Sequence, residues 1–585
     1  MIEAPPGRPG APVSERVRRP FTVGDLLAMV GFLALAMVVF GPFWRHVGTG
    51  YLYNSASDQH MWEWFFASTA HAVVNLDNPL LSPWQNHPLG VNMMANTTML
   101  GLAIPLTPVT IVFGPSVTWA VALTGGLAGT AAGWYWVLSR HVVRSRIGAA
   151  VGGAFCGFAP PMISHANAHP NFAVLVLLPF IVLGVVRLLH TTRPVRDGVV
   201  LGLLVAYQIF LGEEPLLIGA VTFLIFAVSW LAIRRHEVDL RPRRLAAGLG
   251  TAAGVALVIV AFPLWWQFFG PQSYGSIEHG YAGNDAAAFT TFATESWAAQ
   301  PEAARELSMN RTEENAFFGW PLVILFVVLT VCLWRVAVAR AAAIAAFAMC
   351  WLSTGVFLIV DGSATAVPGP WLGMFDLPLF ESVLESRFAL GAVPAIAVLL
   401  AVATDRVLAG RRWVWPLWFA ALAGALLPIA PTPLEVVRRP ETPPFFAQGL
   451  WRNYVDPGGT VVPVPLPDSG SVEPLQWQVE TGFAFPLPEG YFVGPGTDGK
   501  GTYGAPRRPL SRLLEEISED GTEPVIDEGD RARALADLRY WNADVIVLPA
   551  HRYDDQLKAA LEAILHKPAR VVGNVWMWDV REFTP

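Results

Sequence analysis

Apolar residues gather in blocks along this chain, and most blocks are about 15 to 22 residues long. A helix needs about 20 apolar residues to cross the hydrocarbon core of a bilayer, so each block is a candidate transmembrane helix. The pattern predicts an α-helical polytopic membrane protein with about eleven spans. The expected spans are 22–42, 116–138, 148–164, 171–190, 198–212, 215–233, 246–267, 318–334, 341–360, 388–404 and 413–431.

One further apolar segment, 97–113, is short and contains Pro105 and Pro108. Proline removes a backbone donor and breaks or kinks a helix interior. We therefore expect a re-entrant or half-buried segment here, because a full span would also reverse the side of every later loop.

Arginine marks one side of the membrane. The connectors 139–147, 187–196, 234–244, 335–340 and 405–412 are rich in arginine, and all alternate to the side of the N-terminus. Cytoplasmic loops carry such an excess, which predicts a cytoplasmic segment 1–21, a retained signal anchor at 22–42 and a membrane domain 22–431. The first outer loop is then 43–96, and the C-terminus lies outside the cell membrane.

The tail, 432–585, has a different composition. It opens rich in proline and glycine, alternates like a strand over 460–466 and carries a glycine-rich loop at 494–504. Two helix–strand units follow, 531–541 with 544–548 and 554–566 with 569–582. The tail is long enough for a core of its own. We expect an extracytoplasmic α/β or α+β domain, and the tail shows no P-loop, nucleophile elbow or metal-ligand spacing.

Composition agrees with the membrane assignment. Of 585 residues, 53% are hydrophobic and 15% are charged, whereas soluble domains carry about 25% charged residues. This excludes a disordered protein, an ordinary cytosolic enzyme and a nucleic-acid binder with a basic face. The three cysteines fall inside apolar blocks, so the polar regions have no disulfide framework.

Segment 60–74 in the first outer loop has apolar residues at helical spacing, with His60, Glu63 and His71 away from them. Two interpretations stay open. The helix could lie in the membrane interface with its aromatic rings at headgroup depth, or it could pack on the outer ends of the helix bundle.

Polar residues at the ends of spans are costly and indicate a function. Asp58-Gln59-His60 begins the helix just described. Asp58 could act as a general base on an acceptor hydroxyl, or it could only cap the helix.

Two histidines, His165 and His169, lie in the connector that follows the third span. Pro170 disfavours helical geometry at His169, and no glutamate lies between them, so the spacing argues against a zinc site. A hydrogen-bonding role toward a sugar or phosphate, or a simple polar turn, fits better.

Acidic residues occur at two further boundaries. Glu213 and Glu214 precede Pro215, where a cation, an arginine or a ligand hydroxyl would neutralise or bind them, or a solvated turn would explain them. Glu385 and Arg387 lead into the span at 388. Arg387 suits a phosphate, or it forms an ion pair with Glu385 or Glu381.

The order of these segments resembles the GT-C superfamily of integral-membrane glycosyltransferases, particularly bacterial members with an extracytoplasmic C-terminal domain. The likeness covers about residues 20–405. It is carried by a first outer loop with Asp58 and by four short segments, which are Asn86–Asn92, Ser164–Asn171, Tyr207–Glu214 and Glu385–Phe388.

The resemblance implies inverting transfer of a sugar from a polyprenyl-phosphate donor to a glycan or lipid acceptor outside the membrane. Asp58 would be the catalytic base and Arg387 the group that binds the donor phosphate. The implied substrate-binding residues are Gln59, His60, His165, His169, Glu213, Glu214 and Glu385.

Metal use is left open by the resemblance. Metal-dependent members pair acidic residues in or near the first outer loop, but Gln59 follows Asp58 here and that loop has no Asp-x-Asp. No metal ligand or cofactor is therefore assigned, although the carboxylates and histidines named above could supply a substitute site for a divalent cation.

Two other functions would leave different marks on the sequence. A transporter or flippase of lipid-linked sugars should carry charges deep in its spans and show pseudo-symmetric halves, and neither feature is apparent. A non-catalytic assembly protein of the cell envelope would need no pocket, and a pairing of Glu213 and Glu214 with Arg387 would then be structural.

Overall fold

The computed structural model describes residues 20–235, 241–277, 279–280 and 282–584. Most of the expected N-terminal segment 1–21 and part of the connector 234–244 lie outside the described residues. The chain divides into two units. The first is Met1–Arg45, Ala120–Val260 and His279–Glu435; the second is His46–Trp119, Ala261–Glu278 and Val436–Pro585.

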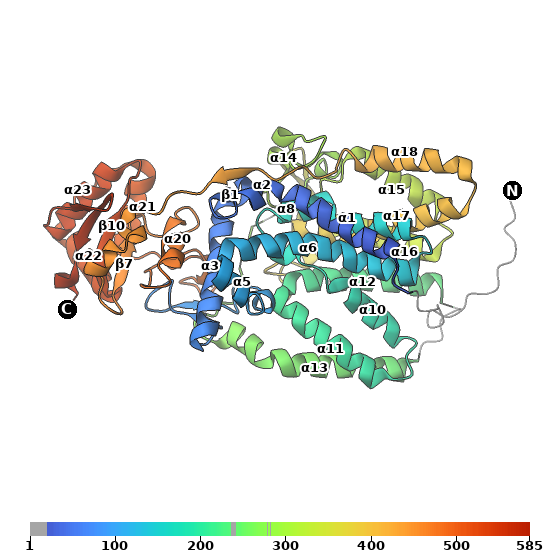
Figure 1. The fold of residues 1–585 in the computed structure, drawn as a ribbon, viewed down its shortest axis with the longest axis horizontal. Helices are drawn as coiled ribbons and strands as arrows, with labels where there is room; N and C mark the ends of the chain where they lie inside the picture. Colours follow the sequence, from blue (N-terminus) through green and yellow to red (C-terminus); the bar gives the residue numbers. More distant parts are fainter. Residues whose placement is uncertain (1–19, 236–240, 278, 281, 585) are drawn as a thin grey trace. The chain divides into compact units, whose positions relative to one another are not determined.

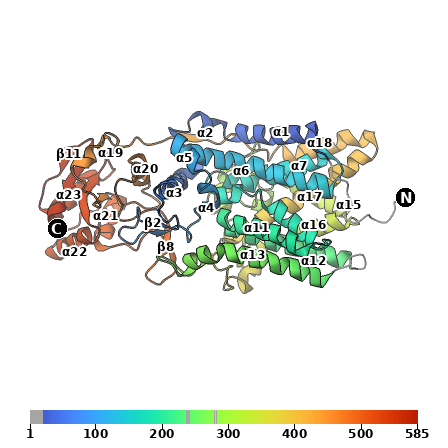
Figure 2. The ribbon, with the colours of Figure 1, turned by 60° about the horizontal axis from the view of Figure 1, so that its bottom comes forward.

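The first unit is built almost entirely of helices, which run alongside one another in Figures 1 and 2. Each expected apolar block contains helix, so the α-helical class is confirmed. The main helices are α1 (Val23–Val39), α6 (Pro115–Val137), α7 (Arg146–Phe158), α10 (Leu178–Leu188), α11 (Pro194–Leu211), α12 (Glu213–Ile233), α13 (Pro242–Phe269), α15 (Trp320–Cys332), α16 (Ala337–Leu352), α17 (Ala392–Ala409) and α18 (Trp415–Leu426).

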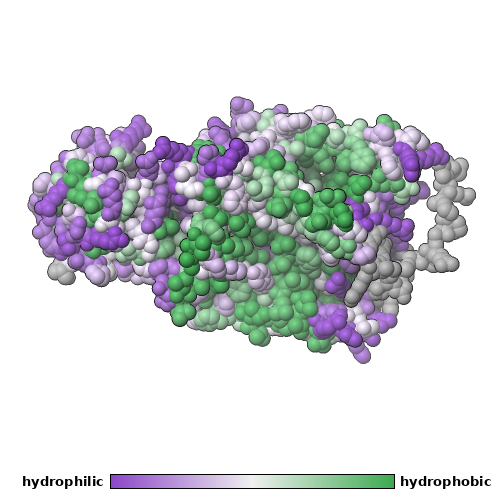
Figure 3. Space-filling view, viewed as in Figure 1, coloured by the Kyte–Doolittle hydropathy of each residue, from purple (hydrophilic) through white to green (hydrophobic). Residues whose placement is uncertain are grey.

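Four helical segments among the described residues are long and apolar enough to cross a membrane. They are Pro194–Leu211, Glu213–Ile233, Pro242–Phe269 and Glu385–Ala409, and several apolar helices are shorter. The hydropathy surface in Figure 3 shows apolar side chains gathered over the helices of this unit. A membrane location follows, while the number of eleven spans stays a prediction.

Helix α17 forms the core of the first unit and packs on α7 and α16. Close approach to α7 depends on small residues: a Cβ added at Gly148 would lie 2.8 Å from the Ala401 carbonyl oxygen, and one at Gly152 would lie 3.0 Å from that of Ala397. Helix α16 presents a run of alanines, Ala341–Ala343, that are buried. Small side chains therefore bring these backbones together.

One boundary differs clearly from the sequence prediction, and the segment with two prolines forms short helices. The span expected at 341–360 is helical only to Leu352, and Phe357–Val360 forms strand β4, which pairs with β5 (Ser363–Pro368). Segment 97–113 forms two short helices, α4 (Leu100–Ala103) and α5 (Thr107–Phe113). The break between them contains Pro105, as the effect of proline on a helix leads one to expect.

The second unit contains helix α3 (Ala56–Asn75) and the C-terminal sheet. Side chains on α3 are buried on nearly all sides from Gln59 to Ala70, His60 and Glu63 among them. The helix packs on α5 and on α20 (Glu473–Glu480). This burial argues against a helix that lies in the membrane interface with one face exposed, whereas packing on the outer ends of the helix bundle stays a prediction.

The tail forms a four-stranded mixed sheet in the order β11-β12-β10-β7. Strand β7 (Thr460–Pro463) runs parallel to β10 (Ala543–Leu548), whereas β12 (Val575–Asp579) is antiparallel to both β10 and β11 (Arg570–Val572). Helices α21 (Pro509–Asp520), α22 (Glu528–Tyr540) and α23 (Asp554–Leu565) contribute Leu514, Leu538 and Leu561 to its core. The glycine-rich loop at 494–504 is a hairpin of β8 (Val493–Pro495) and β9 (Gly501–Tyr503).

Candidate functional site

Arg387 lies at the centre of a buried group of charged side chains in the first unit. It belongs to the 3-10 helix η6 (Glu385–Gly391), just before α17, and 17% of its side chain is exposed. Its Nε donates to both oxygens of Glu313 at 3.1 and 3.2 Å, and its Nη2 donates to Oε1 at 2.5 Å. Its Nη1 donates to Glu214 at 2.7 Å. The guanidinium is thus held by two carboxylates that come from different parts of the chain.

Of the ion-pair partners named from the sequence, the structure shows Glu214 and not Glu381 or Glu385. Glu381 is exposed, and Glu385 accepts a hydrogen bond from the backbone N–H of Ala282 at 3.1 Å. Glu385 therefore tethers a loop and does not neutralise Arg387. Closeness in sequence does not identify the ion-pair partners of Arg387, because the chain turns through η6 and directs the Glu385 side chain away from the guanidinium.

Glu313, which the sequence interpretation missed, lies in the loop before α15. Its side chain is 3% exposed. Burial acts to raise the pKa of Glu313, but Arg387 outweighs it, so the pKa of this carboxyl lies well below its usual range. Glu313-Glu314-Asn315 before an apolar block repeats the pattern that singled out Glu213-Glu214. The same signal could therefore have found it.

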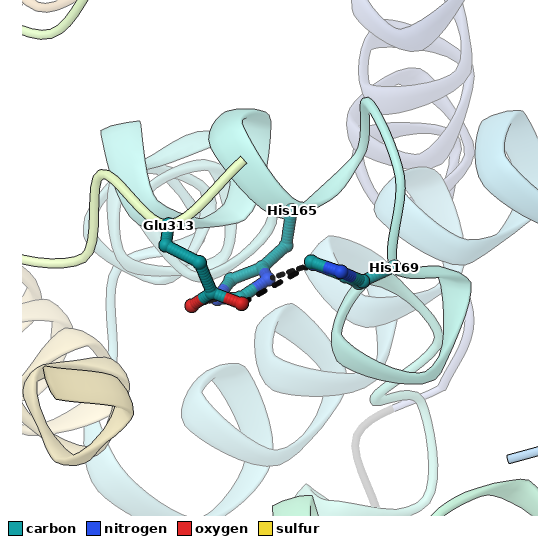
Figure 4. Close-up of side chains that lie close together, drawn as sticks. All are labelled: His165, His169 and Glu313. Atoms are coloured by element: carbon teal, nitrogen blue, oxygen red, sulfur yellow. Dashed lines mark hydrogen bonds and ion pairs between the residues drawn. The ribbon is translucent and has the colours of Figure 1, made fainter. Parts of the chain in front are cut away.

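The two histidines meet beside Glu313, as Figure 4 shows. His165 ends α8 (Pro160–His165), and His169 precedes α9 (Pro170–Ala173). Their Nδ1 atoms lie 3.0 Å apart, and His169 Nδ1 lies 3.6 Å from Glu313 Oε1. His169 has non-helical backbone angles, as Pro170 predicts. A tight turn nevertheless brings the two rings together, which the spacing argument did not allow for.

Hydrogen bonds fix the orientation of His165. Asn315 donates from Nδ2 to Glu313 at 2.9 Å and to Ser386 at 3.1 Å, so its Oδ1 accepts from His165 Nε2 at 2.7 Å. That bond places the ring proton on Nε2 and leaves a lone pair on Nδ1, on the side of His169. Burial lowers the pKa of His165 to about 4, so the ring is neutral at pH 7.

This cluster could hold a divalent metal ion. One ligand atom from each of His165, His169 and Glu313 lies within 4.8 Å of the others. Two imidazoles and a carboxylate suit Zn²⁺ or a related transition metal, and ligation requires the imidazole to be neutral. The bond from Asn315 to the outer nitrogen of His165 is the usual support for a ligating histidine. The sequence offers His165 and His169 as a substitute cation site, but it does not point to Glu313, which comes from a distant segment.

Asp58 belongs to the second unit and lies in the first turn of α3, after the N-cap residue Ser55. Its Oδ1 accepts a hydrogen bond from the Tyr491 hydroxyl at 2.6 Å. Burial and the charge of Asp58 raise the pKa of Tyr491, so that hydroxyl stays protonated and acts as a donor. The capping alternative is not supported, because Asp58 is not at the N-cap position.

The other residues of the expected site are spread over both units. Gln59 is fully buried, accepts from the Leu52 N–H and donates to Glu63 at 2.7 Å. His60 packs on Tyr51, with 4.0 Å between ring centroids. In the first unit, Glu213 lies beside Glu214 in the first turn of α12. Within the first unit, the structure therefore gathers Glu214, His165, His169 and Arg387. In the second unit, Gln59 and His60 follow Asp58 along α3.

Comparison with known proteins finds similarity among solved structures. The oligosaccharyltransferase of Archaeoglobus fulgidus in the apo form has a TM-score of 0.47 and 12% identity, over 89% of this chain and 69% of that chain. The same enzyme, AglB, with an inhibitory peptide and a dolichol-phosphate has a TM-score of 0.47 and 11% identity, over 90% and 69%. ArnT from Cupriavidus metallidurans has a TM-score of 0.44 and 13% identity, over 95% and 98%.

These proteins are GT-C glycosyltransferases, the superfamily that the sequence segments resemble. No protein-family model matches this sequence, and a comparison with curated proteins also finds no match.

Proposed function

We propose that this protein is a GT-C-type membrane glycosyltransferase that moves a sugar from a polyprenyl-phosphate donor to a glycan or lipid acceptor outside the membrane. The observation that carries the proposal is the buried group of Arg387, Glu313, His165 and His169 beside the ends of apolar helices. Charged side chains are expensive at such positions and generally serve a function.

Arg387 is suited to the phosphate of the donor. A guanidinium has five N–H donors, and three of them point at Glu214 and Glu313. Two donors are left for phosphate oxygens, and the carboxylates hold the planar group in one orientation. Glu214 and Glu313 offset the net charge of Arg387, so Arg387 contributes two preorganised N–H donors directed at the charge that develops on the leaving phosphate in the transition state. A divalent cation at His165, His169 and Glu313 would add Lewis-acid stabilisation of that phosphate.

Asp58 is the proposed general base. In inverting transfer, the acceptor hydroxyl attacks the anomeric carbon as the bond from that carbon to the phosphate oxygen breaks. Asp58 takes the hydroxyl proton, and the lipid phosphate leaves with the bonding electrons. The Tyr491 hydroxyl, which donates to Asp58, fixes the direction of the carboxylate.

The test is transfer by the full-length protein in proteoliposomes, with radiolabelled polyprenyl-phosphate hexoses and pentoses as donors and a membrane glycolipid extract as acceptor. Asp58→Asn should reduce transfer by at least 100-fold, within the usual contribution of a general base of about 100- to 10,000-fold. Asp77→Asn is the matched control, because Asp77 is an exposed carboxylate just beyond the end of the same helix. Unchanged transfer in Asp58→Asn would refute the assignment, and movement of intact lipid-linked sugar without transfer would favour a flippase.

A further inference from the structure

The second unit encloses a cavity of about 280 Å³ that the proposed reaction does not use. Residues from the start of the unit, α3, the end of α5 and α20 line it. Small-molecule sites usually have volumes of about 300 to 1,000 Å³, so this cavity is sized for one small ring. Its polar lining comes mainly from Tyr51, His60, Glu63, Arg439, Gln476 and Glu480.

The cavity and Asp58 lie on different faces of α3. Successive residues of an α-helix are about 100° apart, which places His60 about 200° and Glu63 about 140° around the helix from Asp58. His60 and Glu63 both line the cavity, whereas Asp58 does not. A ligand in the cavity would therefore not contact the proposed base.

A buried ion pair forms one wall. Arg439 Nη2 donates to both oxygens of Glu63 at 2.9 and 2.8 Å and to Ser116 at 2.9 Å. Glu63 is also fixed by Gln59. Arg439 Nε is buried and has no hydrogen-bond partner within the described parts of the chain.

Hydrogen bonds and ring contacts hold the remaining polar side chains of the lining in place before any ligand binds. The Tyr51 ring lies between His60 and Arg439, whose Cζ is 4.1 Å from the ring centroid. Its hydroxyl donates to Gln476 Oε1 at 2.9 Å, and Gln476 Nε2 donates to Glu480 at 2.8 Å. These bonds hold carboxylate, amide and phenol groups in place, so a ligand would pay little ordering cost.

The lining also includes the apolar side chains of Phe113, Val117, Leu475 and Val479. A pyranose presents both kinds of group, with C–H groups on its faces and hydroxyls around its edge. Two carboxylates, Glu63 and Glu480, outnumber the single guanidinium, which disfavours a phosphate or a uronic acid. We propose that this cavity binds one neutral sugar residue. Such binding does not depend on whether the protein transfers a sugar.

The experiment measures binding of free methyl glycosides of glucose, galactose, mannose, N-acetylglucosamine and arabinose by saturation-transfer NMR. The full-length protein is held in lipid nanodiscs, because glycoside detergents would compete. Gly48→Trp is designed to fill the cavity: Gly48 lines it, and a Cβ there would meet no atom within 4 Å. Gly373→Trp is the matched control, because Gly373 also has no atom within 4 Å of an added Cβ and does not line the cavity.

At least one neutral glycoside should bind, and Gly48→Trp should weaken that binding at least 10-fold while Gly373→Trp does not. Glu480→Ala, at an exposed rim position, should weaken it several-fold and provides a second variant. Asp58→Asn should leave binding unchanged, which separates this result from failure of the transfer assay. The proposal is overturned if no glycoside binds, if binding survives both cavity variants, or if inorganic phosphate displaces the glycoside.

Discussion

Replacing Glu313 with glutamine should destabilise the protein because it leaves Arg387 with less negative charge around it. The Arg387 and Glu313 side chains are 17% and 3% exposed, so solvent screens the pair little. Removal of one partner of a buried ion pair costs about 3 to 5 kcal/mol. Glu214 still binds Arg387, and the glutamine oxygen can accept one bond, so we expect a loss of about 3 kcal/mol at pH 7.

The assay is unfolding in mixed micelles with increasing SDS, read by tryptophan fluorescence, with Arg387→Met and the double variant completing a thermodynamic cycle. Coupling of about 2 to 3 kcal/mol is expected for residues in direct contact. Glu302→Gln, an exposed glutamate on α14 (Pro301–Leu307), is the matched control and should change stability by less than about 0.5 kcal/mol.

The pH dependence gives a second check on the same pair. The pKa of Glu313 is lowered in the folded protein from an ordinary value of 4.5. The stabilisation of the folded state by the Glu313 carboxylate is therefore complete above pH 4.5, and it is lost as the pH falls from there toward the lowered pKa of the folded protein. The difference between wild type and Glu313→Gln should accordingly shrink under acid conditions. The ion-pair reasoning is refuted if the stability losses of Glu313→Gln and Arg387→Met simply add in the double variant. It is also refuted if the stability difference between wild type and Glu313→Gln is the same at pH 7 and pH 3.

Four further outcomes are expected. Burial raises the pKa of Glu314 from 4.5 to about 7. The free energy of unfolding of wild type, measured by the same assay, should therefore fall by up to about 3 kcal/mol relative to Glu314→Gln as the pH rises from 4.5 to 7. Zn²⁺ or Mn²⁺ should raise the thermal unfolding temperature of wild type but not of His169→Ala, and an equal shift in both would exclude the metal site. Tyr491→Phe should lower transfer about 10-fold by freeing the base, with unfolding temperature as the check on folding. Gly153→Val should destabilise the first unit by more than 2 kcal/mol, because an added Cβ would lie 2.7 Å from a backbone oxygen of α6, whereas Gly125→Val should be tolerated because its Cβ would meet nothing.

The helices of this protein follow from local sequence, because a long block of apolar residues in lipid satisfies its backbone hydrogen bonds within the segment only as a helix. The agreement extends to the break at Pro105 and to the strand β7 in the tail. Even the backbone of His169 is non-helical, as Pro170 predicts. These features depend on neighbouring residues, and a single sequence contains that information.

The candidate site depends on contacts between distant segments, and the sequence alone left those open. Arg387 was identified as a cation at the end of a span, but its partners, Glu313 and Glu214, lie 74 and 173 positions away. The nearby Glu385 was an equally good candidate from the sequence and is directed at a backbone N–H instead. Likewise, the His165–His169 pair became a possible metal site only through Glu313. Charge and helix ends are local properties, whereas the direction in which a side chain points is set by packing of the whole unit.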